Sequence, residues 1–163
     1  LPEIRLITTQ RPEVFCPRLR KILSECGIAL VFLPHISGSF LHGATFYDGK
    51  KVVMGLTVRG KDADRFWFSL FHEISHILEG HIDKEQGADA NDEKQADQMA
   101  ADILIEPSDY LAFIHRGQFD VDSIRHFANK CGIDEGIVVG RLQNEGLISY
   151  SWHNGMKKKY TLS

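Results

Sequence analysis

Residues 65–78 read RFWFSLFHEISHIL, the most strongly patterned segment of the chain. From residue 62 onward, apolar side chains recur at steps of three and four, the spacing of one face of an α-helix. The apolar positions are Phe66, Trp67, Leu70, Phe71, Ile74, Ile77 and Leu78. Gly80 follows as a stop signal. Because the apolar positions cover much of the helical circumference, we expect a buried helix.

The same segment carries His72, Glu73 and His76 in an HExxH pattern. Successive helical residues are turned by about 100°, so these two histidines lie within about 40° of one another, one turn apart along the axis. Both imidazoles can therefore reach one metal ion. Glu73 would lie close enough to take a proton from a water at that ion without binding the ion itself.

HExxH also occurs by chance, and two histidines with a glutamate can form an ordinary solvated helix face. Here, however, apolar residues flank the pattern on both sides. Burying three polar side chains without partners would cost on the order of several kcal/mol, whereas a metal ion would supply partners. The sequence therefore favours a metal site. Zn²⁺ is the first expectation, although Mn²⁺, iron or cobalt would also suit such ligands.

A catalytic zinc site needs a third protein ligand and one open position. In the metzincin pattern HExxHxxGxxH the third histidine would fall at position 82, which is Ile82 here. The glycine of that pattern is also displaced by one residue, to Gly80. His81 misses the pattern by one position, so we expect it to line the cleft or to cap the helix end.

The better candidate for the third ligand is Glu93, which stands four residues before Asp97 in a segment predicted as a helix over residues 92–104. Glu93 would complete the ligand set, and Asp97 would accept a hydrogen bond from the outer nitrogen of a ligating histidine. Two alternatives stay open. Glu93 could be an ordinary acidic residue of a first helical turn, and Asp89 and Asp92 are rival ligands.

Around these helices the sequence predicts an α+β fold. Branched apolar runs predict three strands, over residues 28–33, 44–47 and 52–58, the last two forming a hairpin. Helical spacing predicts further helices over residues 12–26, 108–116, 122–130 and 134–144. We expect a core domain over residues 1–118 and a helix-turn-helix-like extension over residues 119–163 that packs on it.

The extension could also be a DNA-binding unit. Ala128, Gly132 and Val138 fall where a helix-turn-helix needs a small residue, a turn glycine and a buried apolar residue. The only base-reading side chains that its second helix offers are Arg141, Gln143 and Asn144. An acidic pair precedes that helix and would repel phosphate. A structural helix pair is therefore favoured.

Composition narrows the possible classes. Hydrophobic residues make up 43% and charged residues 25%, as in ordinary globular proteins, and the net charge of -3 lacks the basic excess of an obligate nucleic-acid binder. The three cysteines lack metal-framework spacing, and neither a signal peptide nor a membrane span is recognisable. We expect a cytoplasmic protein that does not bind membranes. Since the chain starts at Leu1, we expect it to be cut from a longer one.

Three segments together resemble the ImmA/IrrE family of metallopeptidases. They are residues 65–78 (RFWFSLFHEISHIL), 93–107 (EKQADQMAADILIEP) and 136–148 (GIVVGRLQNEGLI). The resemblance extends from about residue 43 to the end of the chain. The last of the three segments resembles the C-terminal peptidase-like domain of HigA-type XRE-family regulators. The chain departs from the commoner family pattern at Gln95 and Met99, neither of which is an expected ligand.

The resemblance implies a zincin-like core with bacterial or phage origin. It implies His72, His76 and Glu93 as zinc ligands and Glu73 as the general base. The implied substrate is an XRE-type repressor or antitoxin, whose cleavage would derepress genes. DNA would be contacted only through a helix-turn-helix domain preceding Leu1. The alternative is a metal-binding but proteolytically inactive sensor or interaction domain of a HigA-like regulator.

The residue that would stabilise the oxyanion of a peptidase is left open by the sequence. Polar side chains suited to this role are His42, Tyr47, Tyr110 and His115.

Overall fold

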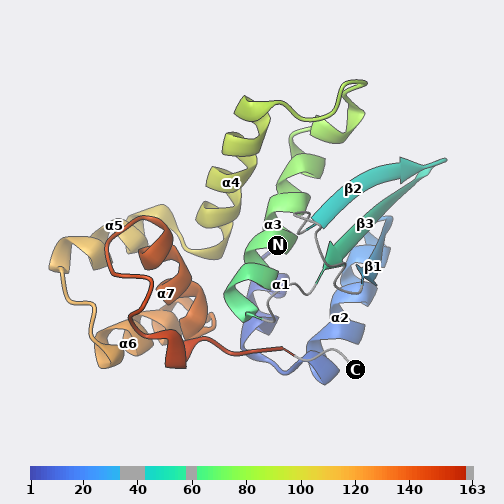
Figure 1. Ribbon diagram of the computed structural model, residues 1–163. Helices are drawn as coiled ribbons and strands as arrows, with labels where there is room; N and C mark the ends of the chain where they lie inside the picture. Colours follow the sequence, from blue (N-terminus) through green and yellow to red (C-terminus); the bar gives the residue numbers. More distant parts are fainter. Residues whose placement is uncertain (34–42, 58–61, 161–163) are drawn as a thin grey trace.

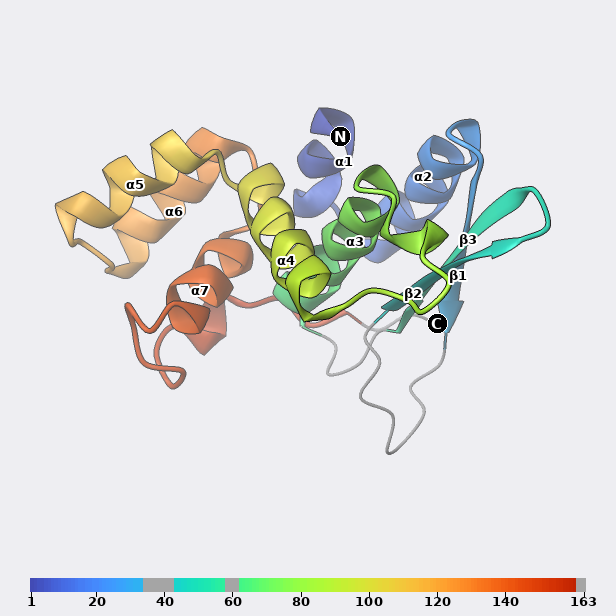
Figure 2. The same cartoon turned by 90° about the horizontal axis from the view of Figure 1, so that it is seen from above.

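The computed structural model describes residues 1–33, 43–57 and 62–160, and over these the fold is α+β, as predicted. The described residues contain seven α-helices: α1 (Pro2–Leu6), α2 (Pro12–Glu25), α3 (Ala63–Leu78), α4 (Ala90–Leu104), α5 (Pro107–Arg116), α6 (Val121–Cys131) and α7 (Glu135–Asn144). Short 3-10 turns lie at η1 (Ile7–Thr9), η2 (His81–Asp83) and η3 (Asn154–Met156). Helix α3 runs through the middle of the molecule, with the sheet and α2 on one side and α4 and α5–α7 on the other (Figures 1 and 2).

The sheet consists of β1 (Ile28–Leu33), β2 (Gly43–Asp48) and β3 (Lys51–Thr57), in the order β1-β3-β2. The predicted hairpin is confirmed: β2 and β3 are antiparallel from Asp48↔Lys51 to Gly43↔Leu56. Strand β1 pairs with β3 in parallel, a pairing that the strand pattern alone does not predict. Among the described residues, β2 is consequently an edge strand, and the edge that does not pair with β3 lies toward α3 (Figure 1).

The predicted helices are confirmed, with small shifts of their ends. The largest shift is at α4, which begins at Ala90 and not at Asp92. The cause is a capping box: the Asp89 carboxylate accepts from the backbone N–H groups of Asn91 and Asp92, while the Asp92 carboxylate accepts from the N–H of Asp89. Helix α1 was not predicted, because its five residues are too few to show a helical period.

The buried face of α3 contacts both α2, near the N-terminus, and the C-terminal segment around Tyr160. Trp67 contacts Phe15 of α2 with ring centroids 4.8 Å apart, and its indole N–H donates to the Tyr160 hydroxyl at 2.9 Å. Next to Tyr160, Lys159 forms an isolated antiparallel β-bridge with Asp62, directly before α3. The C-terminal segment is therefore held against the same core as α2 and α3.

Within the predicted extension over residues 119–163, α7 and Lys157 contact α3 directly. Gly140 of α7 lies so close to Asp64 of α3 that an added Cβ would be 2.5 Å from Asp64 Oδ2. Lys157 reaches the same carboxylate at 2.8 Å. The hydrophobic core is one cluster with members on both sides of the predicted boundary at residues 118–119, among them Leu70 and Val138.

Two of the side chains that could have read DNA bases are engaged in this packing. Gln143 is 1% exposed, and its side-chain amide donates to the carbonyls of Tyr150 and Trp152. The Arg141 guanidinium donates to the carbonyl of Ala101 and to Glu145. Helix α7 thus has the contacts of a structural helix and few free groups for base readout.

In the part of the chain that the structure describes, every helix is too short or too polar to cross a bilayer.

The aromatic contact around α3 makes a prediction about stability. Trp67 has no exposed surface, so Trp67→Ala should lower the free energy of unfolding by about 3–5 kcal/mol through lost burial and a cavity. Trp152 is 57% exposed, and Trp152→Ala should change it by about 0.5 kcal/mol or less. Urea unfolding of both variants measures the difference. Equal destabilisation by the two substitutions would contradict the role given to Trp67.

Candidate metal centre

Helix α3 brings the two histidines of the HExxH pattern together. The Nε2 atoms of His72 and His76 are 2.9 Å apart. His76 is 7% exposed, and its pKa is lowered, first by burial and then by the neighbouring His72. A lowered pKa favours the neutral imidazole, which is the form that binds a metal.

Glu93 enters from α4 and completes a group of three. Its carboxylate oxygens lie 3.2 Å from His72 Nε2 and 3.4 Å from His76 Nε2. One candidate ligand atom from each of the three side chains lies within 4.8 Å of the others. The rival ligands have other partners: Asp89 caps α4, and Asp92 pairs with His81 and Lys84. The structure therefore brings Glu93, and neither rival, to the histidines.

The outer nitrogen of His72 bears on whether a metal fits this group. His72 Nδ1 lies 2.8 Å from Asp97 Oδ1, and since a carboxylate only accepts, Nδ1 carries the proton. In the neutral ring, His72 Nε2 then carries a lone pair that faces His76 Nε2 and the Glu93 carboxylate. A cation can be coordinated by lone pairs that converge on one point in this way. Two imidazoles and one carboxylate match a zinc site with one open position.

Glu73 lies beside this group without belonging to it. One carboxylate oxygen, Oε2, accepts a hydrogen bond from the Thr45 hydroxyl at 2.6 Å. Across the carboxylate, an added Cβ on Gly43 would lie 2.7 Å from Oε1. Burial raises the pKa of Glu73, and the hydrogen bond from Thr45 opposes this shift. A carboxyl with a raised pKa suits general-base work near neutral pH.

The four side chains open into a cleft of about 840 Å³ between β2, α3, η2 and α4. His81 also lines this cleft, as one of the two sequence expectations had it, and is 5% exposed. Its Nδ1 lies 3.0 Å from Nδ1 of His76, the nitrogen that points away from Glu93, so His81 is outside the ligand group. Sequence reasoning missed Gly43 and Thr45, because nothing in the strand pattern tells which residues will face α3.

Of the residues suggested for oxyanion stabilisation, Tyr47 lines the cleft. Its pKa is raised, chiefly by a hydrogen bond to Asp83, so the hydroxyl keeps its proton. Tyr110 is 3% exposed, and its hydroxyl donates to Glu145. His115 lies in α5 and is not among the cleft residues, and His42 lies outside the described residues.

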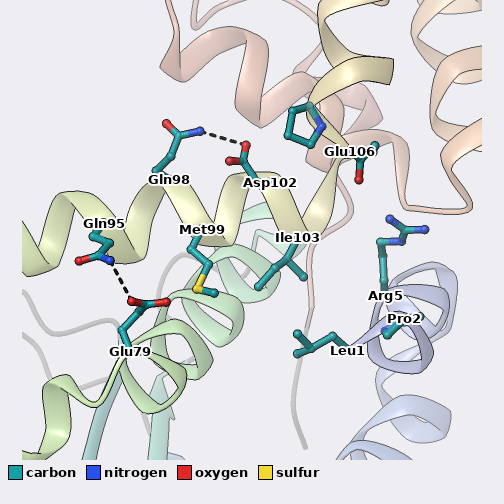
Figure 3. A pocket seen from close by; sticks show the side chains of 11 residues that line it. Leu1, Pro2, Arg5, Glu79, Gln95, Gln98, Met99, Asp102, Ile103 and Glu106 are labelled. Atoms are coloured by element: carbon teal, nitrogen blue, oxygen red, sulfur yellow. Dashed lines mark hydrogen bonds between the residues drawn. The ribbon is translucent and has the colours of Figure 1, made fainter.

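A second pocket, of about 780 Å³, lies between α1 and the other face of α4 (Figure 3). Gln95 and Met99 both line it, and Gln95 donates to Glu79 at 2.9 Å. Each stands two residues from Glu93 or Asp97, which is about 200° around the helix. Gln95 and Met99 therefore belong to this pocket and are not among the residues that line the cleft of the candidate metal centre.

Comparisons with known proteins add no assignment to this geometry. A scan against models of protein families found no match for the chain, and a search of curated proteins found no relative.

The geometry predicts metal binding that depends on Glu93. The wild-type protein should bind about one Zn²⁺ per chain, and Glu93→Ala should weaken binding by more than about 100-fold, beyond the effect of losing an outer partner. A matched control is Asp122→Ala, which removes a carboxylate whose side chain is 94% exposed. Competition with a chromophoric chelator measures the affinities. Wild-type affinity in Glu93→Ala would remove Glu93 from the ligand set.

Proposed function

We propose that the chain is a zinc-dependent metallo-endopeptidase of the ImmA/IrrE type with a zincin-like core. The observation that supports this most is the position of Glu73 beside three converging ligand side chains. His72, His76 and Glu93 would hold the ion, with Asp97 orienting His72. Glu73 is buried, lines the same cleft as the three candidate ligands and is not one of them, as a general base requires.

Several residues of the cleft would have a definable part in peptide hydrolysis. Held by His72, His76 and Glu93, a Zn²⁺ ion would act as a Lewis acid toward the attacking water and the peptide carbonyl. Glu73 takes the proton from the attacking water and passes it to the leaving amine, and Thr45 and Gly43 keep its carboxylate in place. The Tyr47 hydroxyl lines the same cleft and hydrogen-bonds to Asp83, so it would have to exchange that bond for one to the developing oxyanion.

The sheet supports a polypeptide as the substrate. In the described part of the chain, β2 pairs with β3 alone, and residues 43–47 of β2 line the cleft. The free edge of a strand presents backbone N–H and C=O groups that pair with an extended chain. A peptide added along β2 would pass the candidate metal centre. The more specific substrate, an XRE-type repressor or antitoxin in the cytoplasm, follows from the family resemblance.

Substitution of the general base tests this proposal. Glu73→Gln should retain Zn²⁺ and lose cleavage of a co-expressed XRE-type repressor by about 10²–10⁴-fold, because the amide cannot accept the proton. Fragment masses and metal content are measured on the same samples. Cleavage by Glu73→Gln at the wild-type rate would overturn the mechanism. Zinc binding by a wild type that cleaves no repressor would favour the inactive sensor domain instead.

The contact between β2 and Glu73 yields an independent prediction. Gly43→Ala would place a Cβ 2.7 Å from Glu73 Oε1 and displace the carboxylate. A shift of about 1 Å can cost about 10²-fold in rate, so cleavage should fall by that order while zinc affinity is retained. Gly155→Ala is the control, since its Cβ would have no neighbour within 4 Å. Unchanged cleavage by Gly43→Ala would show that Glu73 is not held by this contact.

A further inference from the structure

Behind His76, on the side away from Glu93, lie three side chains that the ligand set does not include. His81 faces His76, Asp92 faces His81, and Lys84 pairs with Asp92. We propose that this series, the His81 chain, positions His76 for metal binding by fixing its proton on Nδ1. The inference rests on the metal centre proposed above and adds three positioning residues to it.

The order of protons along the chain follows from the contacts. For His76 to bind a metal through Nε2, its proton must sit on Nδ1. That proton points at Nδ1 of His81, 3.0 Å away, which must then accept it. His81 in turn carries its own proton on Nε2, which faces Asp92 Oδ1 at 3.4 Å. Each ring has one possible tautomer in this arrangement.

The burial of these groups supports a defined role. His81 is 5% exposed and Asp92 is 4% exposed. Buried polar groups of this kind are costly unless they are paired, and here each one pairs with the next. The last member, Lys84, has a side chain that is 44% exposed, and it closes the chain at the protein surface. The Asp92 carboxylate is further fixed by the backbone N–H of Asp89 at 3.0 Å.

The backbone after α3 is shaped to bring His81 to this position. In a continued helix, residue 81 would be turned by about 140° from residue 76, away from its ring. Gly80 has a φ of 70°, in the left-handed region that favours glycine, and it ends the helix. The turn η2 then returns His81 to the face of His76, with ring centroids 5.1 Å apart.

The two histidine ligands are therefore supported in different ways. His72 is oriented by Asp97, a carboxylate whose side chain is 58% exposed. His76 is oriented by a buried imidazole, with a carboxylate one step further out. Outer partners of ligating histidines set the tautomer and the orientation of the ring, and losing one typically costs 10–100-fold, roughly, in metal affinity.

Two substitutions of His81 test the proposal by metal affinity. His81→Leu removes the acceptor and should weaken Zn²⁺ binding by about 10–100-fold. His81→Asn places an amide oxygen near the former Nδ1 position, so its affinity should lie nearer to that of the wild type. His126→Leu, at an exposed histidine of α6, is the matched control and should change nothing. Far-UV circular dichroism of the metal-free proteins checks that each variant is folded.

A second measurement needs no variant. In the zinc-loaded wild type, ¹⁵N NMR of the histidine rings should show His76 protonated on Nδ1 and His81 protonated on Nε2. A proton on His81 Nδ1, or wild-type zinc affinity in folded His81→Leu, would overturn the positioning role while leaving the metal centre intact. A visible spectrum of the Co²⁺-loaded protein that loses a ligand in His81→Asn would make His81 a ligand instead. Failure of the wild type to bind Zn²⁺ would remove the metal centre and the His81 chain together.

Discussion

The close approach of α4 to α3 is the contact on which the site depends. Ala96 and Ala100 have no exposed surface, and their small side chains let the two helix backbones lie near each other. This approach brings Glu93 to the two histidines and Asp97 to the outer nitrogen of His72. A large side chain at either alanine would separate the carboxylates from the imidazoles. The candidate metal centre is thus as much a product of helix packing as of the HExxH spacing.

Local geometry explains which parts of the site were predictable. His72 and His76 share one helix, so their separation follows from helical repeat alone. Glu93 lies on another helix, and the sequence left Asp89 and Asp92 as rivals. The structure distinguishes the three carboxylates by their partners. Asp89 belongs to the capping box at the start of α4, and Asp92 pairs with His81. In the same way the β2–β3 hairpin was predictable, whereas the parallel pairing of β1 with β3 required long-range contacts.

The contacts that the sequence could not supply are those that connect distant elements. Thr45 reaches Glu73 from a strand 28 residues earlier, and Tyr160 reaches Trp67 from 93 residues later. The position of the His81 side chain depends on the left-handed backbone at Gly80, because this residue decides on which side of α3 the chain returns. For the extension, the turn after α6 was recognisable from Gly132, but the burial of Gln143 was not. Two of these placements, Thr45 at Glu73 and His81 at His76, surround the candidate metal centre with partners.

The most direct test of the account is X-ray absorption spectroscopy at the zinc edge on the purified, zinc-loaded protein. The account predicts a four-coordinate ion with two histidine nitrogens at about 2.0–2.1 Å and a carboxylate oxygen, with the remaining position taken by solvent. A first shell made of oxygen atoms alone, or one with three or more imidazoles, would contradict a centre built from His72, His76 and Glu93.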